Sequence, residues 1–199
     1  MKETITFLSL LLSSAVFSQS NFTQFSLEAE YGLNYSRNPK QTELNHVGLG
    51  MRYMFDEYWG IKGDYGYDGF SSDESPETKL TSHRFSTQAV YNIGRLLNLR
   101  EVTHGSINLL LHSGIGISLL DSDTATGLDK VGNFIAGGTL QVYISNSFTL
   151  TGDISGILNF SQNTRFDGLR QKEFTGKMLN ASIGLTYYLG KNKSTSDWR

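Results

Sequence analysis

Eight charged or ionisable side chains lie on one side of strand-like stretches of the sequence, where they could pair with one another or carry ions. They are Glu28, Glu30, Arg52, Lys62, Asp64, Arg84, His112 and Asp153. Both signs of charge are present, and buried charges need partners. We therefore expect a polar network of ion pairs and hydrogen bonds that fills an interior. The alternative is an ion-conducting gate, in which an Arg or Lys with two carboxylates in reach exchanges partners.

Catalytic chemistry has weaker support in the sequence. No Gly-x-Ser-x-Gly elbow is present. A lipid-modifying enzyme of a membrane surface would need a histidine that points outward near a rim. Among the four histidines only His83 fits this description, with Ser82 and Ser86 nearby. We expect no catalytic residues and treat a lipid-modifying enzyme as the least favoured alternative.

Metal and cofactor sites are not expected either. Residues 71–77 and 121–129 resemble calcium-binding loops in composition only, and the second lacks the twelve-residue ligand order of a helix–loop–helix site. The chain has no cysteine, so it has neither a thiol nucleophile nor a thiolate metal site. No nucleotide-binding or zinc motif is present. We predict no cofactor and no metal ion.

The composition and the first residues of the chain limit the class of protein to which it can belong. The net charge of −2 argues against nucleic acid as a partner. Residues 1–18 have a lysine, an apolar run too short to span a bilayer, and small residues before a cleavage point, so we predict a signal peptide. The predicted domain is residues 19–190, followed by a short periplasmic tail at 191–199.

Period-two alternation of apolar and polar residues predicts eight strands. They lie at 23–36, 46–55, 59–70, 83–93, 107–120, 133–144, 148–160 and 180–190. Such lengths match tilted strands that cross a bilayer. Longer polar connections (37–43, 70–81, 120–130, 161–173) alternate with tight ones (56–58, 145–147), as in outer-membrane barrels. The connection 94–106 is long where a tight turn is expected, and a short amphipathic helix would fit there.

Alternation alone does not say which face points inward. A secreted, lipocalin-like barrel would enclose a small apolar ligand with its apolar face. Here, however, the polar face consists mostly of Gly, Ser, Thr, Asn and Gln, which suit a narrow interior better than a surface in water. An eight-stranded barrel has an interior just wide enough for side chains to fill. We therefore expect the apolar face to meet lipid.

Aromatic residues of the apolar face gather toward the predicted strand ends, as in the two aromatic girdles of membrane barrels. Those expected near the tight turns are Phe25, Phe55, Trp59, Tyr91, Phe148 and Tyr187, and those expected near the long loops are Tyr35, Tyr67, Phe85, Phe134 and Phe160. The simpler explanation is that aromatic residues favour strands in general.

Over residues 22–199 the chain resembles the OmpA-like eight-stranded barrels, including the Bacteroidetes-type porin-family transmembrane domain. The resemblance rests on the strand count and on two segments, "YWGIKGDYGYDGF" (58–70) and "YYLGKNKSTSDW" (187–198). It implies an all-β, up-and-down, antiparallel transmembrane barrel in the bacterial outer membrane. That barrel would be a structural protein with a largely plugged lumen and exposed loops, either a narrow pore or an adhesion surface.

The resemblance also implies partners. The lipid of the outer membrane would surround the barrel, and the pattern Gly184-x-x-Tyr187-x-Leu189 is similar to the last-strand signal read by the barrel-insertion machinery. In many relatives a similar junction leads into a peptidoglycan-binding domain. Because only nine residues follow Gly190, we expect no such domain here. The sequence does not identify a partner of the loops.

Overall fold

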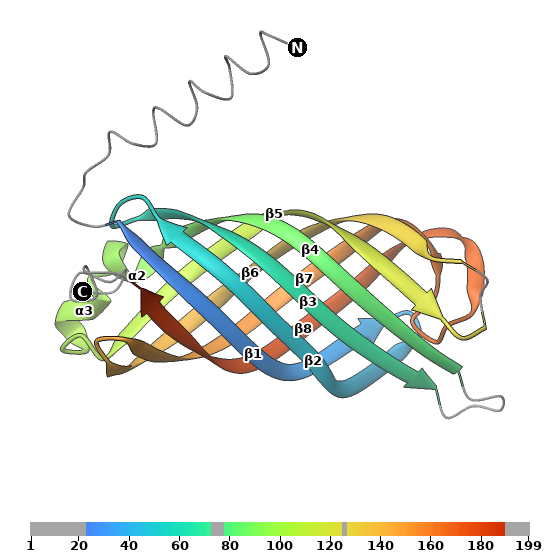
Figure 1. Ribbon diagram of the computed structural model, residues 1–199, viewed down its shortest axis with the longest axis horizontal. Helices are drawn as coiled ribbons and strands as arrows, with labels where there is room; N and C mark the ends of the chain where they lie inside the picture. The colour runs from blue at the N-terminus through green and yellow to red at the C-terminus, as the bar shows by residue number, and fades with distance from the viewer. Residues whose placement is uncertain (1–22, 73–77, 125–126, 190–199) are drawn as a thin grey trace, which may run out of the picture.

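The computed structural model describes residues 23–72, 78–124 and 127–189 and shows a closed barrel of eight antiparallel strands in sequence order (Figure 1). The strands are β1 (Gln24–Arg37), β2 (Lys40–Met54), β3 (Trp59–Ser72), β4 (Thr78–Asn92), β5 (Ile107–Ser122), β6 (Asp129–Ser145), β7 (Phe148–Thr164) and β8 (Arg170–Leu189). Each strand pairs with its neighbours, and β1 pairs with β8 to close the ring. The predicted fold class is confirmed.

Alternation sorts the side chains between the two faces of the wall. Along β8, Ile183 is 68% exposed, whereas its neighbour Ser182 is 7% exposed. Along β5, Ile115 is 71% exposed and Ser118 is 1% exposed. The apolar face therefore points outward and the polar face inward, because a one-residue step along a strand moves the side chain to the opposite face. A lipocalin-like carrier requires the reverse arrangement.

The strands are longer than the sequence pattern indicates, and the predicted long loops are correspondingly too long. Residues 40–43 belong to β2, so the turn between β1 and β2 is reduced to residues 38 and 39. The predicted loops 70–81, 120–130 and 161–173 likewise contain the ends of β3 to β8. Near the loop end, several strands have polar side chains on both faces because both faces meet water there, but the backbone amides still pair across each hairpin. The alternation of polarity therefore ends before the hydrogen-bonded ladder does.

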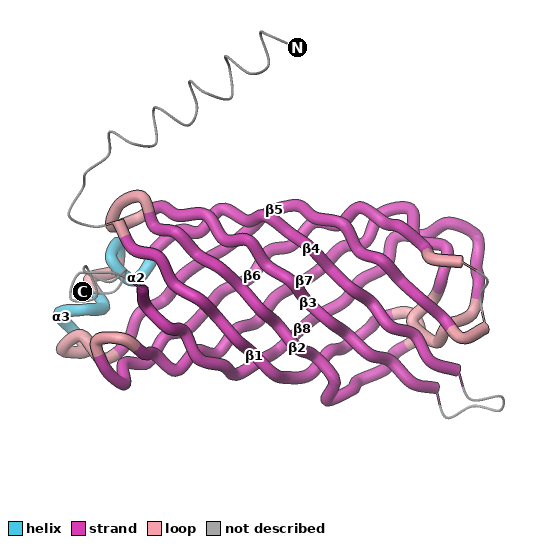
Figure 2. The backbone as a smooth tube through the Cα atoms, in the orientation of Figure 1, coloured by secondary structure: helices cyan, strands magenta, loops and turns pink. Residues whose placement is uncertain are grey.

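The two ends of the barrel differ in their connections (Figure 2). The turn end carries residues 55–58, 93–106 and 146–147. At the opposite end, the loop end, β1, β3, β5 and β7 finish and β2, β4, β6 and β8 begin. The unusual connection at the turn end holds two one-turn helices, α2 (Ile93–Leu96) and α3 (Leu99–Val102). The side chain of Asn92 accepts a hydrogen bond from the backbone N–H of Arg95 and so caps α2.

No helix within the described part of the chain is long and apolar enough to cross a membrane.

Gly32 shows how closely the wall packs where the ring closes. A Cβ atom at this position would lie 2.1 Å from the backbone oxygen of Ala181, on the neighbouring strand β8. No L-amino acid side chain fits at that distance without moving the backbone. Glycine is therefore required at this point of the β1–β8 seam.

Several predicted segments fall outside the described residues. These are the signal peptide at 1–18, the tail at 191–199, and parts of the acidic loops at 71–77 and 121–129.

Candidate functional site

The eight predicted interior residues all point into the barrel, and five of them form one ion-pair network in its middle. Glu28 of β1 accepts from two cations: its Oε1 lies 2.7 Å from Arg52 Nη1 of β2, and its Oε2 lies 2.9 Å from Lys62 Nζ of β3. The cross-strand register sets Arg52 directly opposite Lys62. Gly50 leaves the space that the Lys62 side chain occupies, since a Cβ there would lie 2.9 Å from Lys62 Cε.

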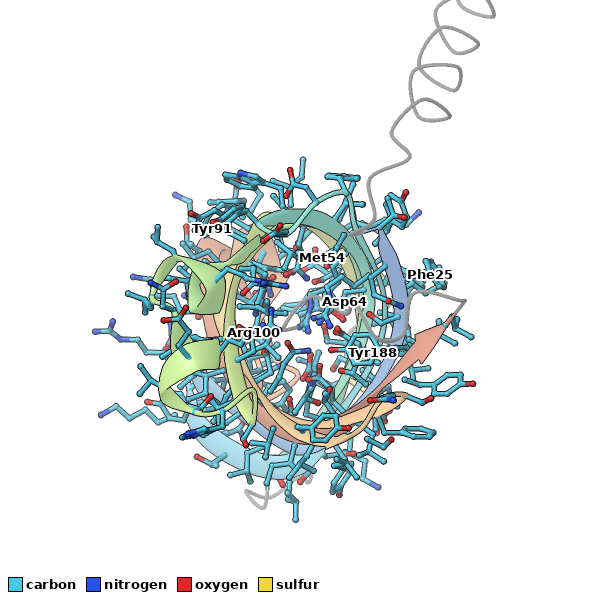
Figure 3. The ribbon with its side chains drawn as sticks, turned by 90° about the vertical axis from the view of Figure 1, so that its left-hand side faces the viewer. Phe25, Met54, Asp64, Tyr91, Arg100 and Tyr188 are labelled. Atoms are coloured by element: carbon cyan, nitrogen blue, oxygen red, sulfur yellow. The ribbon has the colours of Figure 1, made fainter. Side chains whose placement is uncertain are left out.

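Lys62 has further carboxylates within reach. Its Nζ lies 3.7 Å from Glu30 Oε1 and 3.9 Å from Asp64 Oδ2. Glu30 also accepts a hydrogen bond of 2.5 Å from the hydroxyl of Ser182 on β8. One ammonium group thus lies within 4.0 Å of carboxylate oxygens from three acidic residues. Asp64 points into the ring in the end-on view (Figure 3).

A second polar group centres on Asp153 of β7. Its Oδ2 lies 2.9 Å from His112 Nε2 of β5 and accepts from the hydroxyl of Thr139 of β6 at 2.7 Å. The hydroxyl of Ser155 donates to the other carboxylate oxygen. His112 Nδ1 in turn lies 2.6 Å from Gln88 Oε1 of β4. These contacts connect four strands across the interior.

A third polar group lies nearer the loop end, and two of its ionisable residues are absent from the predicted network. Asp68 accepts from Arg84 Nη1 at 3.0 Å and from Asn180 Nδ2 at 3.0 Å, and its Oδ1 lies 2.7 Å from His46 Nδ1. Of these, Arg84 was predicted, whereas His46 and Asp68 were not. The sequence could have indicated His46 and Asp68, because both occupy positions on the polar, inward face of their strands.

Apolar side chains occupy the interior at both ends of this polar zone. At the turn end, Met54, Val90 and Leu110 form a buried group that we name the turn-end cluster. Tyr188 lies beside this end of the interior and accepts a hydrogen bond from Gln141 at 2.9 Å. Met54 and Tyr188 both point into the ring (Figure 3).

A larger group, the loop-end cluster, lies in the interior toward the opposite end. It comprises Phe70, Leu80, Leu120, Val131, Ile135, Ile157, Phe166 and Met178. The Phe70 and Phe166 rings lie 5.0 Å apart. The sequence pattern did not predict either cluster, although each strand member sits at a position where the alternation calls for a polar residue. Val90, which interrupts the polar side of its strand, is one such signal.

The predicted aromatic girdles are on the outer face, as Phe25 and Tyr91 illustrate in the end-on view (Figure 3). At the turn end, Trp59 contacts Tyr91 with ring centroids 4.7 Å apart, and Phe148 contacts Tyr187 at 4.8 Å. Phe55 is also exposed at this end.

The loop-end girdle is less regular than predicted. Tyr35 lies two residues from the end of β1, whereas Tyr67, Phe134 and Phe160 lie four or five residues from the loop ends of their strands. Phe85 was predicted near the loop end, but it occupies the midpoint of β4. The prediction began this strand at His83, whereas the strand begins at Thr78.

The one histidine considered for catalysis lies apart from its candidate serines. His83 faces outward, and its Nδ1 lies 2.8 Å from the hydroxyl of Tyr65. Ser82 and Ser86 are buried on the opposite face of the strand, so the Ser/His combination that the lipid-modifying alternative would need does not assemble. Across residues 23–72, 78–124 and 127–189, no group of three or more His, Asp or Glu residues could hold a metal ion.

Comparison with known proteins agrees with this architecture. A family model described as "Outer membrane protein beta-barrel domain" matches residues 4–176. No curated protein matches the chain.

Several solved structures share the fold. Neisserial surface protein A matches with a TM-score of 0.59 and 11% identity, covering 84% of this chain and 97% of that one. A major outer membrane protein from Thermus thermophilus matches with a TM-score of 0.56 and 11% identity, covering 84% and 99%. OprG from Pseudomonas aeruginosa gives 0.54 and 10%, covering 84% and 97%.

Proposed function

Because the chain belongs to the outer membrane protein beta-barrel domain family, we propose that it is a structural barrel with a closed lumen and exposed loops. The protein is located in the bacterial outer membrane, where its apolar outer face meets lipid. Of the functions that the sequence left open, a closed structural barrel agrees best with the contents of the lumen. A narrow pore or an adhesion surface remains the alternative reading of the same fold.

The observation that carries this proposal is the order of side chains along the lumen. The ion pairs lie between the turn-end cluster and the loop-end cluster, and Leu110 and Phe166 are both 0% exposed. A hydrated ion that entered from either side would first have to displace packed apolar side chains. Beyond them it would meet charges that already have partners, such as Glu28 and Asp68. Both features oppose conduction.

Planar-bilayer recording tests the closed lumen. We expect purified, folded protein to produce no discrete current steps, because an ion would have to displace the packed side chains of both apolar clusters. Lys62→Met serves as the comparison, since it removes the cation that three carboxylates share. Regular openings of the wild-type protein that change in size or frequency in Lys62→Met would contradict the closed lumen and favour the gate.

We also propose that the barrel is not an enzyme. The support is the separation of His83 from Ser82 and Ser86 by the wall itself. We further propose that the barrel-insertion machinery recognises β8 during assembly into the outer membrane, because the strand ends in the pattern with Tyr187 and Leu189.

A further inference from the structure

The outer wall has a hollow between strands that otherwise carry large apolar side chains. It extends over β8, β1, β2, β3 and β4 and has a volume of about 680 Å³. Its outward side chains include Ala29, Met51, Gly63, Tyr65, Phe85 and Leu185. This volume lies within the roughly 300–1,000 Å³ of small-molecule sites, which are also mainly apolar. The hollow is therefore large enough for part of a lipid.

Two small residues create the hollow. Gly63 pairs with Met51 on one side and Thr87 on the other, and a Cβ atom added to Gly63 would have no heavy atom within 4 Å. Ala29 lies between Leu49 and Leu185 in the same wall. The floor at Gly63 is backbone, while the neighbouring side chains form the sides. The result is a groove whose sides are apolar.

One edge of the groove carries polar atoms that face outward. The Tyr65 hydroxyl lies 2.8 Å from His83 Nδ1, and the two rings stack with centroids 6.1 Å apart. Phe85 and Tyr67 contact this pair at 5.1 and 5.4 Å. The bond between the two groups uses one of their two donors, so one O–H or N–H donor is left over. An ester oxygen can accept from that donor, whereas hydrocarbon cannot.

A second outer hollow helps to decide what the first one holds. It has a volume of about 820 Å³ and lies over Gly138, Gly152 and Ala181. Its other outward side chains are aliphatic, and its two polar lining residues, Asp153 and Ser182, are buried toward the lumen. It therefore has space for hydrocarbon but no outward side chain to fix a polar group. Of these two hollows, the first combines an apolar groove with an outward polar pair and the second does not.

We propose that the groove at Gly63 binds one acyl chain of a membrane lipid, with the ester group of that chain at the Tyr65–His83 pair. The groove is continuous with the apolar wall that the outer membrane surrounds, so lipid is the molecule that reaches it. A flexible chain can follow a concave surface, whereas the wall of a second barrel is convex. An unfilled groove would also forfeit dispersion contacts along its lining.

Native mass spectrometry of detergent-purified protein, titrated with palmitoyl-oleoyl phosphatidylethanolamine, tests this proposal. We expect the wild-type barrel to retain one lipid in preference to further ones. Gly63→Leu fills the groove and should weaken retention of that lipid by about tenfold or more, because the chain loses its apolar contact area. Tyr65→Phe removes only the anchoring hydroxyl and should weaken it by a smaller factor.

Gly132→Leu is the matched control. Gly132 is also an exposed strand glycine with no heavy atom within 4 Å of an added Cβ, and it lines neither hollow. It should retain lipid like the wild type, and heat-modifiable gel migration of all variants checks folding. Equal retention by the wild type and Gly63→Leu would overturn the proposal. Equal weakening of lipid retention by Gly132→Leu would also overturn it. So would a dimer of the wild-type protein that is lost in Gly63→Leu, because the groove would then bind a second barrel.

Discussion

Replacing Arg52 with alanine is expected to lower the free energy of unfolding by about 3–5 kcal/mol, the usual cost of breaking a buried ion pair by removing one partner. The Arg52 and Glu28 side chains are only 2% and 1% exposed, and their charged atoms lie 2.7 Å apart. Lys62 cannot compensate fully, because Glu30 and Asp64 share its charge. The midpoint of urea unfolding in lipid bilayers measures this change, provided that the slope of the transition is constant.

The double variant Arg52→Ala/Glu28→Gln is the control for this experiment. It removes the Glu28 carboxylate, which Lys62 alone compensates only in part in the single variant, so it should recover part of the lost stability. An unchanged urea midpoint for Arg52→Ala would show that Arg52 does not face a dry lumen. A double variant less stable than the single one would show that charge pairing is not the cause of the loss.

Ile115→Arg is expected to destabilise the barrel in bilayers by about 2–4 kcal/mol, the cost measured for a cation on the lipid face near the membrane midplane. Ile115 lies in the middle of β5 and is 71% exposed on the outer wall. The same substitution on a wall that faced water would have little effect, since surface changes usually remain within about 0.5 kcal/mol. Unfolding titrations in bilayers distinguish the two cases.

Leu169→Arg provides the matched comparison. Leu169 is also largely exposed, at 48%, but it lies in the connection between β7 and β8, at the loop end. There the new arginine reaches water, and stability should change little. A loss at Leu169 as large as the loss at Ile115 would mean that the effect reflects general disruption and not the depth in the membrane.

The strand count, the pairing order and the orientation of the wall were all predictable, because each depends on a repeated pattern. Residues such as Ile183 and Ser182 alternate in type, and this alternation persists through eight segments. Closure of the ring follows from the same pattern, since an open sheet would leave edge amides unpaired in hydrocarbon. The chemistry of the lumen was accessible to the same reasoning, as the inward placement of Glu28, Arg52 and Lys62 shows.

Features that depend on particular three-dimensional neighbours were not predictable in this way. Val90 and Leu110 interrupt the polar face of separate strands, and only the closed ring brings them together in one apolar cluster. The positions of the strand ends were also missed. The hydrogen-bonded part of β2 already begins at Lys40, whereas the alternation of apolar and polar residues is clear only further along the strand. The groove at Gly63 depends on five strands at once, so no single segment could indicate it.

The orientation of the wall is the central claim, and a pair of nitroxide labels tests it most directly. The chain contains no cysteine, so Ser182→Cys and Ile183→Cys each give one labelling site, at adjacent positions of β8. In bilayers, the label at 183 should collide readily with oxygen dissolved in the hydrocarbon, while the label at 182 should be shielded from it. A shielded label at 183 together with an oxygen-accessible label at 182 would contradict the account.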